Sequence, residues 1–345
     1  MPAASVPSRL PEYQPALAWF TALGAAWVFV LVMLGAFTTS IGAGMIFPDW
    51  PLSNGSLNPD GWLTNVAMFA EHSHRLSAGL MSLITVAIGV AIWRRESRRW
   101  VRRLALFAVA LVFAQALVGG LRVLLDHLHV EMVNTSVGRL FAMMHACLAQ
   151  IYVCTLFALA LGVSRPWIES CAQAGRAVVA PAWRRLAVAC CGLLLLQLAV
   201  AAIMRHSHAG LAIVTFPWST PEGALLPELW TFRIGIHFAH RLMAVVLSVA
   251  LVWLALRILR DRGSSAALRA AAQALVTLLA VQITLGAASV LTFRNPYYTT
   301  AHVIVGALTL AGCFGLTWWS YRDVIEGTPS SESESRSAAR SFAEV

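Results

Sequence analysis

Eight long apolar stretches, separated by polar segments, set the hydropathy pattern of this chain of 345 residues. An α-helix needs about 20 mostly apolar residues to cross a bilayer, and each stretch reaches that length. The first is too long for the apolar core of a signal peptide. The pattern predicts an all-α integral membrane protein with eight transmembrane helices, at residues 16–39, 65–93, 103–124, 140–163, 183–204, 232–258, 267–291 and 300–320.

Composition and charge agree with this class of protein. Hydrophobic residues make up 59% of the chain and charged residues 12%, and the mean hydropathy is +0.71. All 25 basic residues are arginine, and they gather after the second, fourth and sixth stretches. Such runs are typical of cytoplasmic connections, so we expect no nucleic acid partner and both termini in the cytoplasm. The runs are Arg94, Arg95, Arg98, Arg99, Arg102 and Arg103; Arg165, Arg176, Arg184 and Arg185; and Arg257, Arg260, Arg262 and Arg269.

An internal repeat divides the chain into two halves. Short motifs recur in the same order and at the corresponding helix of each half, which indicates duplication. Four helices separate the copies, so we expect two tandem four-helix bundles related by a pseudo-two-fold axis along the membrane normal. The matches are Gly42-Ala43-Gly44 with His208-Ala209-Gly210, Phe47-Pro48 with Phe216-Pro217, His74-Arg75-Leu76 with His240-Arg241-Leu242, Gln115 and Gly119 with Gln282 and Gly286, and His145 with His302.

The predicted organisation has five parts. A cytoplasmic segment, 1–15, precedes the first bundle, 16–163, and a cytoplasmic linker, 164–182, leads to the second bundle, 183–322. The last part, 323–345, is rich in serine and charge and is predicted to be a disordered cytoplasmic tail. The six cysteines include no CxxC pair, which argues against a disulfide framework or a zinc site.

Four histidines are candidate metal ligands, because ionisable residues inside a membrane usually face a cavity or a partner. His74, His145, His240 and His302 each lie in the first two turns of an even-numbered span, so they share one depth near the outer face. Two imidazoles from two helices can bind one heme iron from opposite sides, which suggests His74 with His145 and His240 with His302. A core histidine bonded to a backbone carbonyl is the alternative, but repetition of the pair favours ligands. Zinc or copper usually needs more protein ligands.

Three charged residues lie beside these histidines. Arg75 and Arg241 directly follow proposed ligands and are predicted either to bind heme propionates or to extend to the interface as ordinary arginines at a helix end. Glu71 lies three residues before His74, whereas the matching residue of the second half is His237. The asymmetry suggests proton transfer or stabilisation of a cationic intermediate by Glu71, with a solvated carboxylate as the alternative.

The remaining histidines are weaker candidates. His72 lies about 200° around the helix from His74, so the two cannot face one iron. Loop histidines are usually solvated, which is the expectation for His127, His129, His206 and His208. The tryptophans of the outer loops are predicted to form an interfacial belt or a lid over the hemes: Trp50, Trp62, Trp218 and Trp230.

These motifs resemble those of the heme A synthase family over residues 16–322. The resemblance rests on eight helices in two halves, a Glu-x-x-His-Arg motif at Glu71, a His-Arg motif at His240, and single histidines at His145 and His302. It implies oxidation of the C8 methyl group of heme O to a formyl group by successive hydroxylations, which supplies heme A to terminal oxidases.

The resemblance also implies how the two halves divide the work. The second half would hold a heme b cofactor through His240 and His302, and the first half would be the substrate site, with His74 and His145 near the iron and Glu71 catalytic. Expected partners are heme O, heme O synthase, terminal oxidase assembly factors, membrane lipid and a second copy in a homo-oligomer. A bacterial inner membrane is expected, because the N-terminal segment lacks an amphipathic presequence.

One departure from the family concerns cysteine. Many bacterial members carry a cysteine pair in the first outer loop, whereas residues 40–64 and 205–231 of this chain contain none. A mechanism that relies on those thiols cannot be transferred.

Two other classes of protein remain as alternatives. A membrane cytochrome b would pass electrons between two hemes, but its usual pattern stacks them across the bilayer, whereas all four histidines here share one depth. A heme or small-molecule transporter would place its site at the midplane on broken helices, which the sequence does not indicate.

Overall fold

The computed structural model describes residues 12–131, 135–172 and 181–326. Within these ranges eight helices are long and apolar enough to cross a membrane, which confirms the predicted class and number. Two of them begin about one turn earlier than predicted, at Arg99 and Pro296, because the first turn of a helix tolerates polar residues and proline. The bounds are α1 (Pro15–Ser40), α2 (Val66–Arg95), α3 (Arg99–Leu124), α4 (Val137–Gly162), α6 (Arg184–His206), α7 (Phe232–Arg260), α8 (Ala266–Leu291) and α9 (Pro296–Ser320).

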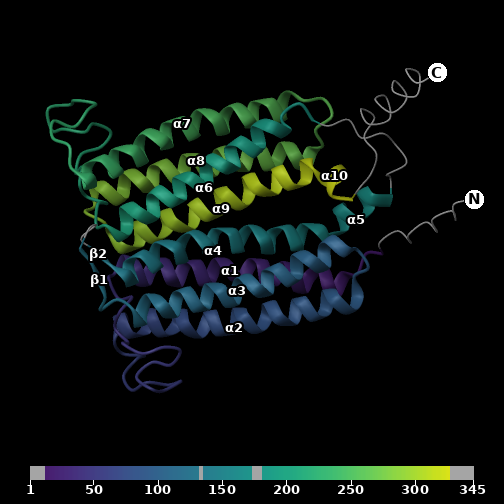
Figure 1. The fold of residues 1–345 in the computed structure, drawn as a ribbon. Helices are drawn as coiled ribbons and strands as arrows, with labels where there is room; N and C mark the ends of the chain where they lie inside the picture. The colour runs from purple at the N-terminus through teal and green to yellow at the C-terminus, as the bar shows by residue number, and fades with distance from the viewer. Residues whose placement is uncertain (1–11, 132–134, 173–180, 327–345) are drawn as a thin grey trace, which may run out of the picture.

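The long helices form two groups that lie side by side (Figure 1). In the group α1–α4 each helix contacts the next, and α1 and α4 close the ring; the group α6–α9 has the same contacts. The long connections, 41–65 and 207–231, gather at one end of the helices with the hairpin of β1 (His129–Val130) and β2 (Thr135–Ser136). We call this the long-loop end. The opposite end carries α5 (Arg165–Ala172) and α10 (Arg322–Glu326).

Capping residues fix where several helices start at the long-loop end. Asn65 accepts hydrogen bonds from the backbone N–H groups of Ala67 and Met68, Ser136 accepts one from Arg139, and Thr231 accepts one from Ile234. A cap of this kind stabilises a helix by about 1 kcal/mol. The caps of α2, α4 and α7 place the first turns of three of the four histidine-bearing helices.

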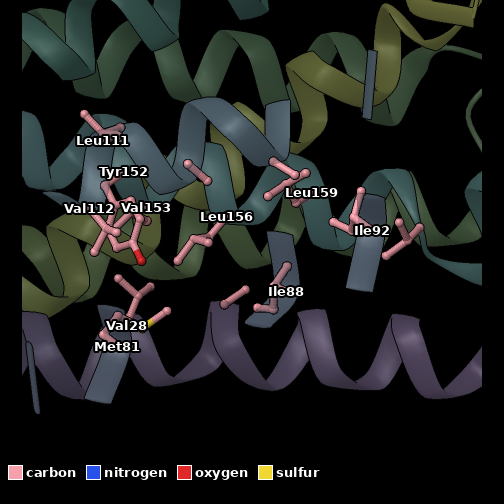
Figure 2. Packing of buried hydrophobic residues seen from close by; sticks show 14 of the residues in the cluster. Val28, Met81, Ile88, Ile92, Leu111, Val112, Tyr152, Val153, Leu156 and Leu159 are labelled. Atoms are coloured by element: carbon pink, nitrogen blue, oxygen red, sulfur yellow. The ribbon is translucent and has the colours of Figure 1, made fainter. Parts of the chain in front are cut away.

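Each group encloses an apolar core. In the first group, one cluster of almost completely buried side chains joins three helices (Figure 2). It includes Val28 of α1, Met81 and Ile88 of α2, and Leu156 of α4. The second group has a matching core of leucines, which includes Leu251, Leu254, Leu275 and Leu310. Packing of this kind fixes the relative depth of the helices, and therefore of the histidines that they carry.

The two groups meet through α1 and α4 on one side and α6 and α9 on the other. Arg205, in the last turn of α6, spans this interface and donates to the carbonyl oxygen of Ala36 (2.7 Å) and to Oγ of Ser40 (2.8 Å), both on α1. Thr300 of α9 also donates to Oγ of Ser40 (3.2 Å). Polar contacts therefore tie the groups together at the long-loop end.

At the opposite end the structure adds two short helices to the predicted organisation. The predicted linker, 164–182, contains α5 (Arg165–Ala172), and residues 323–326, which were predicted to belong to a disordered tail, form part of α10 (Arg322–Glu326). Charge pairs explain α10: Asp323 binds Arg184 and Glu326 binds Arg98. The rest of the predicted linker, 173–180, and of the predicted tail, 327–345, lies outside the described residues.

Asp323→Asn is expected to lower the stability of the protein by roughly 3 kcal/mol, because it leaves the guanidinium of Arg184 without its buried partner. The side chains of Arg184 and Asp323 are only 12% and 2% exposed, and their atoms are 2.5 Å apart. Thermal unfolding of the detergent-solubilised protein measures the change. The control is Glu169→Gln, which breaks an ion pair with Arg165 whose side chains are 58% and 69% exposed, and should change little. Equal effects of the two substitutions would contradict the prediction.

Candidate functional site

The four candidate histidines form two pairs in space. The ring centroids of His74 on α2 and His145 on α4 are 6.5 Å apart, with their planes at 82°. Those of His240 on α7 and His302 on α9 are also 6.5 Å apart, with their planes at 67°. Each pair lies inside one helix group, near the long-loop end. The pairs that the sequence suggested are therefore neighbours in the structure.

The separation within each pair suits one metal ion between two rings. Two metal–imidazole bonds of roughly 2 Å, with roughly 1 Å more from each nitrogen to its ring centre, place the centroids about 6 Å apart. Rings in direct stacking contact could lie closer than this. Among the described residues no group of three or more His, Cys, Asp or Glu side chains could hold a metal ion, so the donor set of each site is two imidazoles. Two axial imidazoles fit a heme iron better than zinc.

Backbone contacts orient one histidine of each pair. Nδ1 of His145 lies 3.1 Å from the carbonyl oxygen of Gln115, and the amide of Gln115 donates in turn to the carbonyl oxygen of His145 (2.8 Å). Nδ1 of His302 lies 3.1 Å from the carbonyl oxygen of Gln282. Donation from Nδ1 leaves Nε2 as the ligating nitrogen, which is the usual arrangement around metal-binding histidines.

Glutamine amides also lie beside the second pair. Nε2 of Gln197 on α6 donates to the carbonyl oxygen of His240 (3.0 Å) and is 3.5 Å from Nε2 of its ring. Nε2 of Gln282 is 3.4 Å from Nε2 of His302. Nδ1 of His240 is buried without a hydrogen-bond partner in the described part of the chain. A metal bound between these rings would use the Nε2 lone pairs and so compete with these two amide contacts.

Glycines on neighbouring helices make room for three of the four rings. A Cβ atom at Gly35 of α1 would lie 2.7 Å from Cε1 of His74. A Cβ atom would lie 3.0 Å from Cε1 of His145 at Gly119, and 3.0 Å from Cε1 of His302 at Gly286. Gly119 and Gly286, the glycines that match in the repeat, therefore have the same structural role, because each lets a histidine ring lie close to a neighbouring helix.

Glu71 and Arg75 hold the first long loop over the first pair. Glu71 is 4% exposed, and one of its carboxylate oxygens accepts hydrogen bonds from the N–H groups of Ile46 (2.7 Å) and Phe47 (3.3 Å). The other oxygen binds Arg75 at 2.6 Å. The guanidinium of Arg75 also donates to the carbonyl oxygens of Asp49 (2.7 Å) and Phe47 (3.1 Å). The carboxylate is therefore buried and paired, not solvated.

Asp49 shapes the same loop from outside the helices. Its carboxylate accepts hydrogen bonds from the N–H groups of Asn54 (2.8 Å) and Gly55 (2.7 Å). Burial raises the pKa of Asp49, but these two N–H groups and the charge of Arg75 together lower it by more than burial raises it. The pKa of Asp49 therefore lies below its usual value. The negative charge of Asp49 thus stabilises the loop at neutral pH, and that contribution is lost as the pH falls through its pKa.

The second half repeats this arrangement with a histidine in place of the glutamate. Nδ1 of His237 lies 3.3 Å from the backbone nitrogen of Ile213, and its Nε2 lies 3.2 Å from Nε of Arg241. A neutral imidazole has one lone-pair nitrogen, so it accepts a hydrogen bond from only one of these two donors. The guanidinium of Arg241 donates to the carbonyl oxygens of Thr215 (2.7 Å) and Trp218 (3.1 Å). Glu71 and His237 thus occupy equivalent places between a long loop and an arginine. They differ in charge.

The other histidines and the tryptophans occupy varied places. His72 is buried against the first loop, with Nδ1 2.9 Å from Oγ of Ser53, so it does not face the first pair. His127, His129 and His208 are exposed, as expected of loop residues, whereas His206 is half-buried at the end of α6, so the expectation of a solvated loop histidine is wrong for it. Trp50 lies over Gly120 of α3, where a Cβ atom would overlap its ring. Trp50 therefore lies beside α3, the helix whose Gln115 contacts His145, and its role as a lid stays a prediction.

Three residues near the sites had no role in the sequence-based prediction. Gly35 and Gln197 have no repeat partner, so only the folded structure reveals their contacts with His74 and His240. Arg122 could have been found from helical spacing. It lies three and seven residues after Gly119 and Gln115, so it shares their face of α3, toward the first pair.

Comparisons with known proteins identify the family of this chain. Residues 18–314 match the model of the cytochrome oxidase assembly protein family, COX15-CtaA. Proteins named heme A synthase are similar along most of their length. The one from Staphylococcus haemolyticus is 24% identical over 84% of this chain and 90% of its own, and the one from Listeria monocytogenes is 26% identical over 82% and 88%. That from Macrococcus caseolyticus is 23% identical over 87% and 94%. The chain therefore belongs to the COX15-CtaA family of cytochrome oxidase assembly proteins.

Proposed function

We propose that this chain is a heme A synthase, which oxidises the C8 methyl group of heme O to a formyl group by successive hydroxylations. The observation that carries the proposal is the pair of two-histidine sites, each with ring centroids 6.5 Å apart, in neighbouring helix groups. The family match and the names of the relatives support it. Heme A made in this way would supply terminal oxidases. The partners we propose are heme O synthase, oxidase assembly factors and a second copy of the chain.

We assign heme b to His240 and His302, and the substrate heme O to the site of His74 and His145. The charge difference supports this division, because Glu71 lies beside the first pair and the uncharged acceptor His237 beside the second. Duplication of a four-helix unit accounts for the similarity of the two sites. When bound, heme supplies the redox-active iron that the side chains of the chain lack.

The residues of the first site bind, orient and shield the substrate. Gln115 fixes the ring of His145, and Gly35 lets the ring of His74 approach α1. Arg75 and Glu71 hold the first loop in place by five hydrogen bonds to its backbone, which would keep water from the site. Glu71 is also the buried carboxylate that lies closest in sequence to the ligand His74, which suits it to hold or move a proton during hydroxylation.

Identification of the extracted hemes tests the proposed reaction. The protein is purified from cells that also make heme O, and its hemes are extracted and separated by chromatography. Heme b accompanied by heme A or a hydroxylated intermediate is the expected result. Heme b alone, with heme O in excess, would refute the proposal and favour an electron-transfer cytochrome b.

We propose a bacterial plasma membrane as the location, with the histidine pairs toward its outer face. The relatives are bacterial, and the arginine runs predict cytoplasmic connections at the end opposite the long loops. Both α1 and α10 have an end there (Figure 1). A reporter enzyme that works only in the cytoplasm should therefore be active when it is fused after Val345. Activity of an exported reporter at that position would reverse the topology.

Gly35→Ala is expected to weaken binding of heme at the first site by about tenfold, because the added Cβ atom would lie 2.7 Å from the ring of His74 and displace it. Titration of the purified protein with heme, followed by absorbance, measures the dissociation constant. Gly79→Ala on α2 is the control, since a Cβ atom there meets nothing within 4 Å. Unchanged binding in Gly35→Ala would show that the ring is free to move.

A further inference from the structure

One arginine at the first site lacks the partners that the others have. Arg122 lies in the last turn of α3, on the face that carries Gln115 and Gly119 toward His145. It is close enough to the first pair for its charge to act on both rings and on Glu71. The first loop passes directly over it, because a Cβ atom at Gly44 would overlap both terminal nitrogens of its guanidinium.

The hydrogen bonding of Arg122 differs from that of Arg75 and Arg241. Those two guanidinium groups donate to loop carbonyl oxygens and to Glu71 or His237, so few of their N–H groups remain for a ligand. The guanidinium of Arg122, by contrast, makes no hydrogen bond or ion pair within the described residues, which include the whole of α1–α4. The structure therefore argues against Arg75 and Arg241 as the main propionate ligands. Arg122 has its N–H groups available for this role.

An inward-facing guanidinium needs an anion. Arginine stays protonated in proteins, and burying its charge without a partner is strongly unfavourable. The nearest acidic side chains are engaged elsewhere: Glu71 binds Arg75 and the first loop, and Asp126 accepts a hydrogen bond from Ser136 (2.6 Å). A planar guanidinium suits a carboxylate, which it can bind through two parallel hydrogen bonds.

The second half has an arginine in a comparable place. Cδ of Arg294, just after α8, would lie 3.7 Å from a Cβ atom at Gly210, the repeat partner of Gly44. Arg294 is not the repeat partner of Arg122, because it lies farther along the chain from Gln282 than Arg122 does from Gln115. It also has a left-handed backbone, with φ 65°. An arginine therefore lies against the same loop glycine in both halves.

We propose that Arg122 binds a propionate carboxylate of the porphyrin at the first site and so selects tetrapyrroles that carry free acid side chains. This inference rests on the proposed function, since it assumes that the first pair receives heme O. It replaces Arg75 as the principal anion ligand there and leaves Arg75 to hold the loop. Arg122 fixes the edge of the porphyrin, and the two histidines fix its centre.

The test compares heme with its dimethyl ester, in which both propionates are neutral. Each is titrated into purified wild-type protein, Arg122→Gln and Arg139→Gln, and the dissociation constants are measured by absorbance. Arg139 is an exposed arginine of α4 at the same end, so it controls for the loss of one positive charge. Wild type and Arg139→Gln should bind heme at least tenfold more tightly than the ester. Arg122→Gln should bind both about equally.

Two results would overturn the inference. One is equal binding of heme and ester by wild type, which needs no variant and so does not depend on how the substitutions fold. The other is an Arg122→Gln protein that still prefers heme by the wild-type factor. Arg122→Lys should restore part of the preference, because it keeps the charge but loses the paired hydrogen bonds. The titrations do not require turnover, so a failure of heme O oxidation with an intact preference for heme would refute the proposed function alone.

Discussion

Glu71→Gln is expected to lower the rate of heme O oxidation by about 100-fold while the protein keeps its bound heme b. The carboxylate is buried, and it is the charged member of a motif that in the second half contains a histidine. Glutamine retains a carbonyl oxygen that can accept the hydrogen bond from the N–H of Ile46, so the loop should keep its position. What is lost is the negative charge and the capacity to take up a proton.

The rate is measured as heme A and hydroxylated intermediate formed per protein, and the bound heme b is measured by absorbance. His237→Gln is the matched control, because it alters the equivalent acceptor of the second loop and leaves Glu71 intact. It should leave the oxidation rate close to that of wild type. If Glu71→Gln oxidised heme O at the wild-type rate, Glu71 would be only an anchor for the first loop. If both variants lost activity equally, the loops and not the carboxylate would explain the effect.

The sequence predicted the eight spans because hydropathy alone determines them, and the structure has all eight. It misplaced the start of the tail, because the ion pair of Arg184 with Asp323 joins positions more than a hundred residues apart. Local composition at residues 322–326 is polar and gives no indication of that partner. Charge pairs between residues far apart in the sequence cannot be predicted from the hydropathy of neighbouring residues.

The site shows the same limit at closer range. Spacing from the helix starts was enough to place His74 beside His145 and His240 beside His302, since the two helices of each pair face each other across one four-helix ring and the histidines share one depth. Spacing could not tell what Arg75 touches, because the carbonyl oxygens of Phe47 and Asp49 reach it only when the loop folds back. Which arginine is left to bind a ligand therefore follows from the three-dimensional structure.

His302→Ala is expected to reduce the heme b content of the purified protein at least tenfold, because changes even to residues that support a metal ligand lower metal affinity by about 10- to 100-fold. The ring of His302 is one of only two imidazoles at the second site, and the carbonyl oxygen of Gln282 holds its orientation. Under the proposed assignment, loss of either ring would leave the iron of heme b with one protein ligand. His240→Ala should therefore have the same result, although His240 lies on α7 and His302 on α9.

Heme b is measured from the absorbance of the reduced protein, relative to protein concentration, together with a melting curve that shows whether the variant is folded. His129→Ala, at an exposed histidine of the β hairpin, controls for the loss of an imidazole and should keep its full heme content. His145→Ala, at the equivalent ligand of the first site, should keep heme b as well and lose oxidation of heme O. A folded His302→Ala protein with unchanged heme b would place the resident cofactor elsewhere. If His145→Ala lost heme b instead, the roles of the two sites would be reversed, and Glu71 would then lie beside the cofactor.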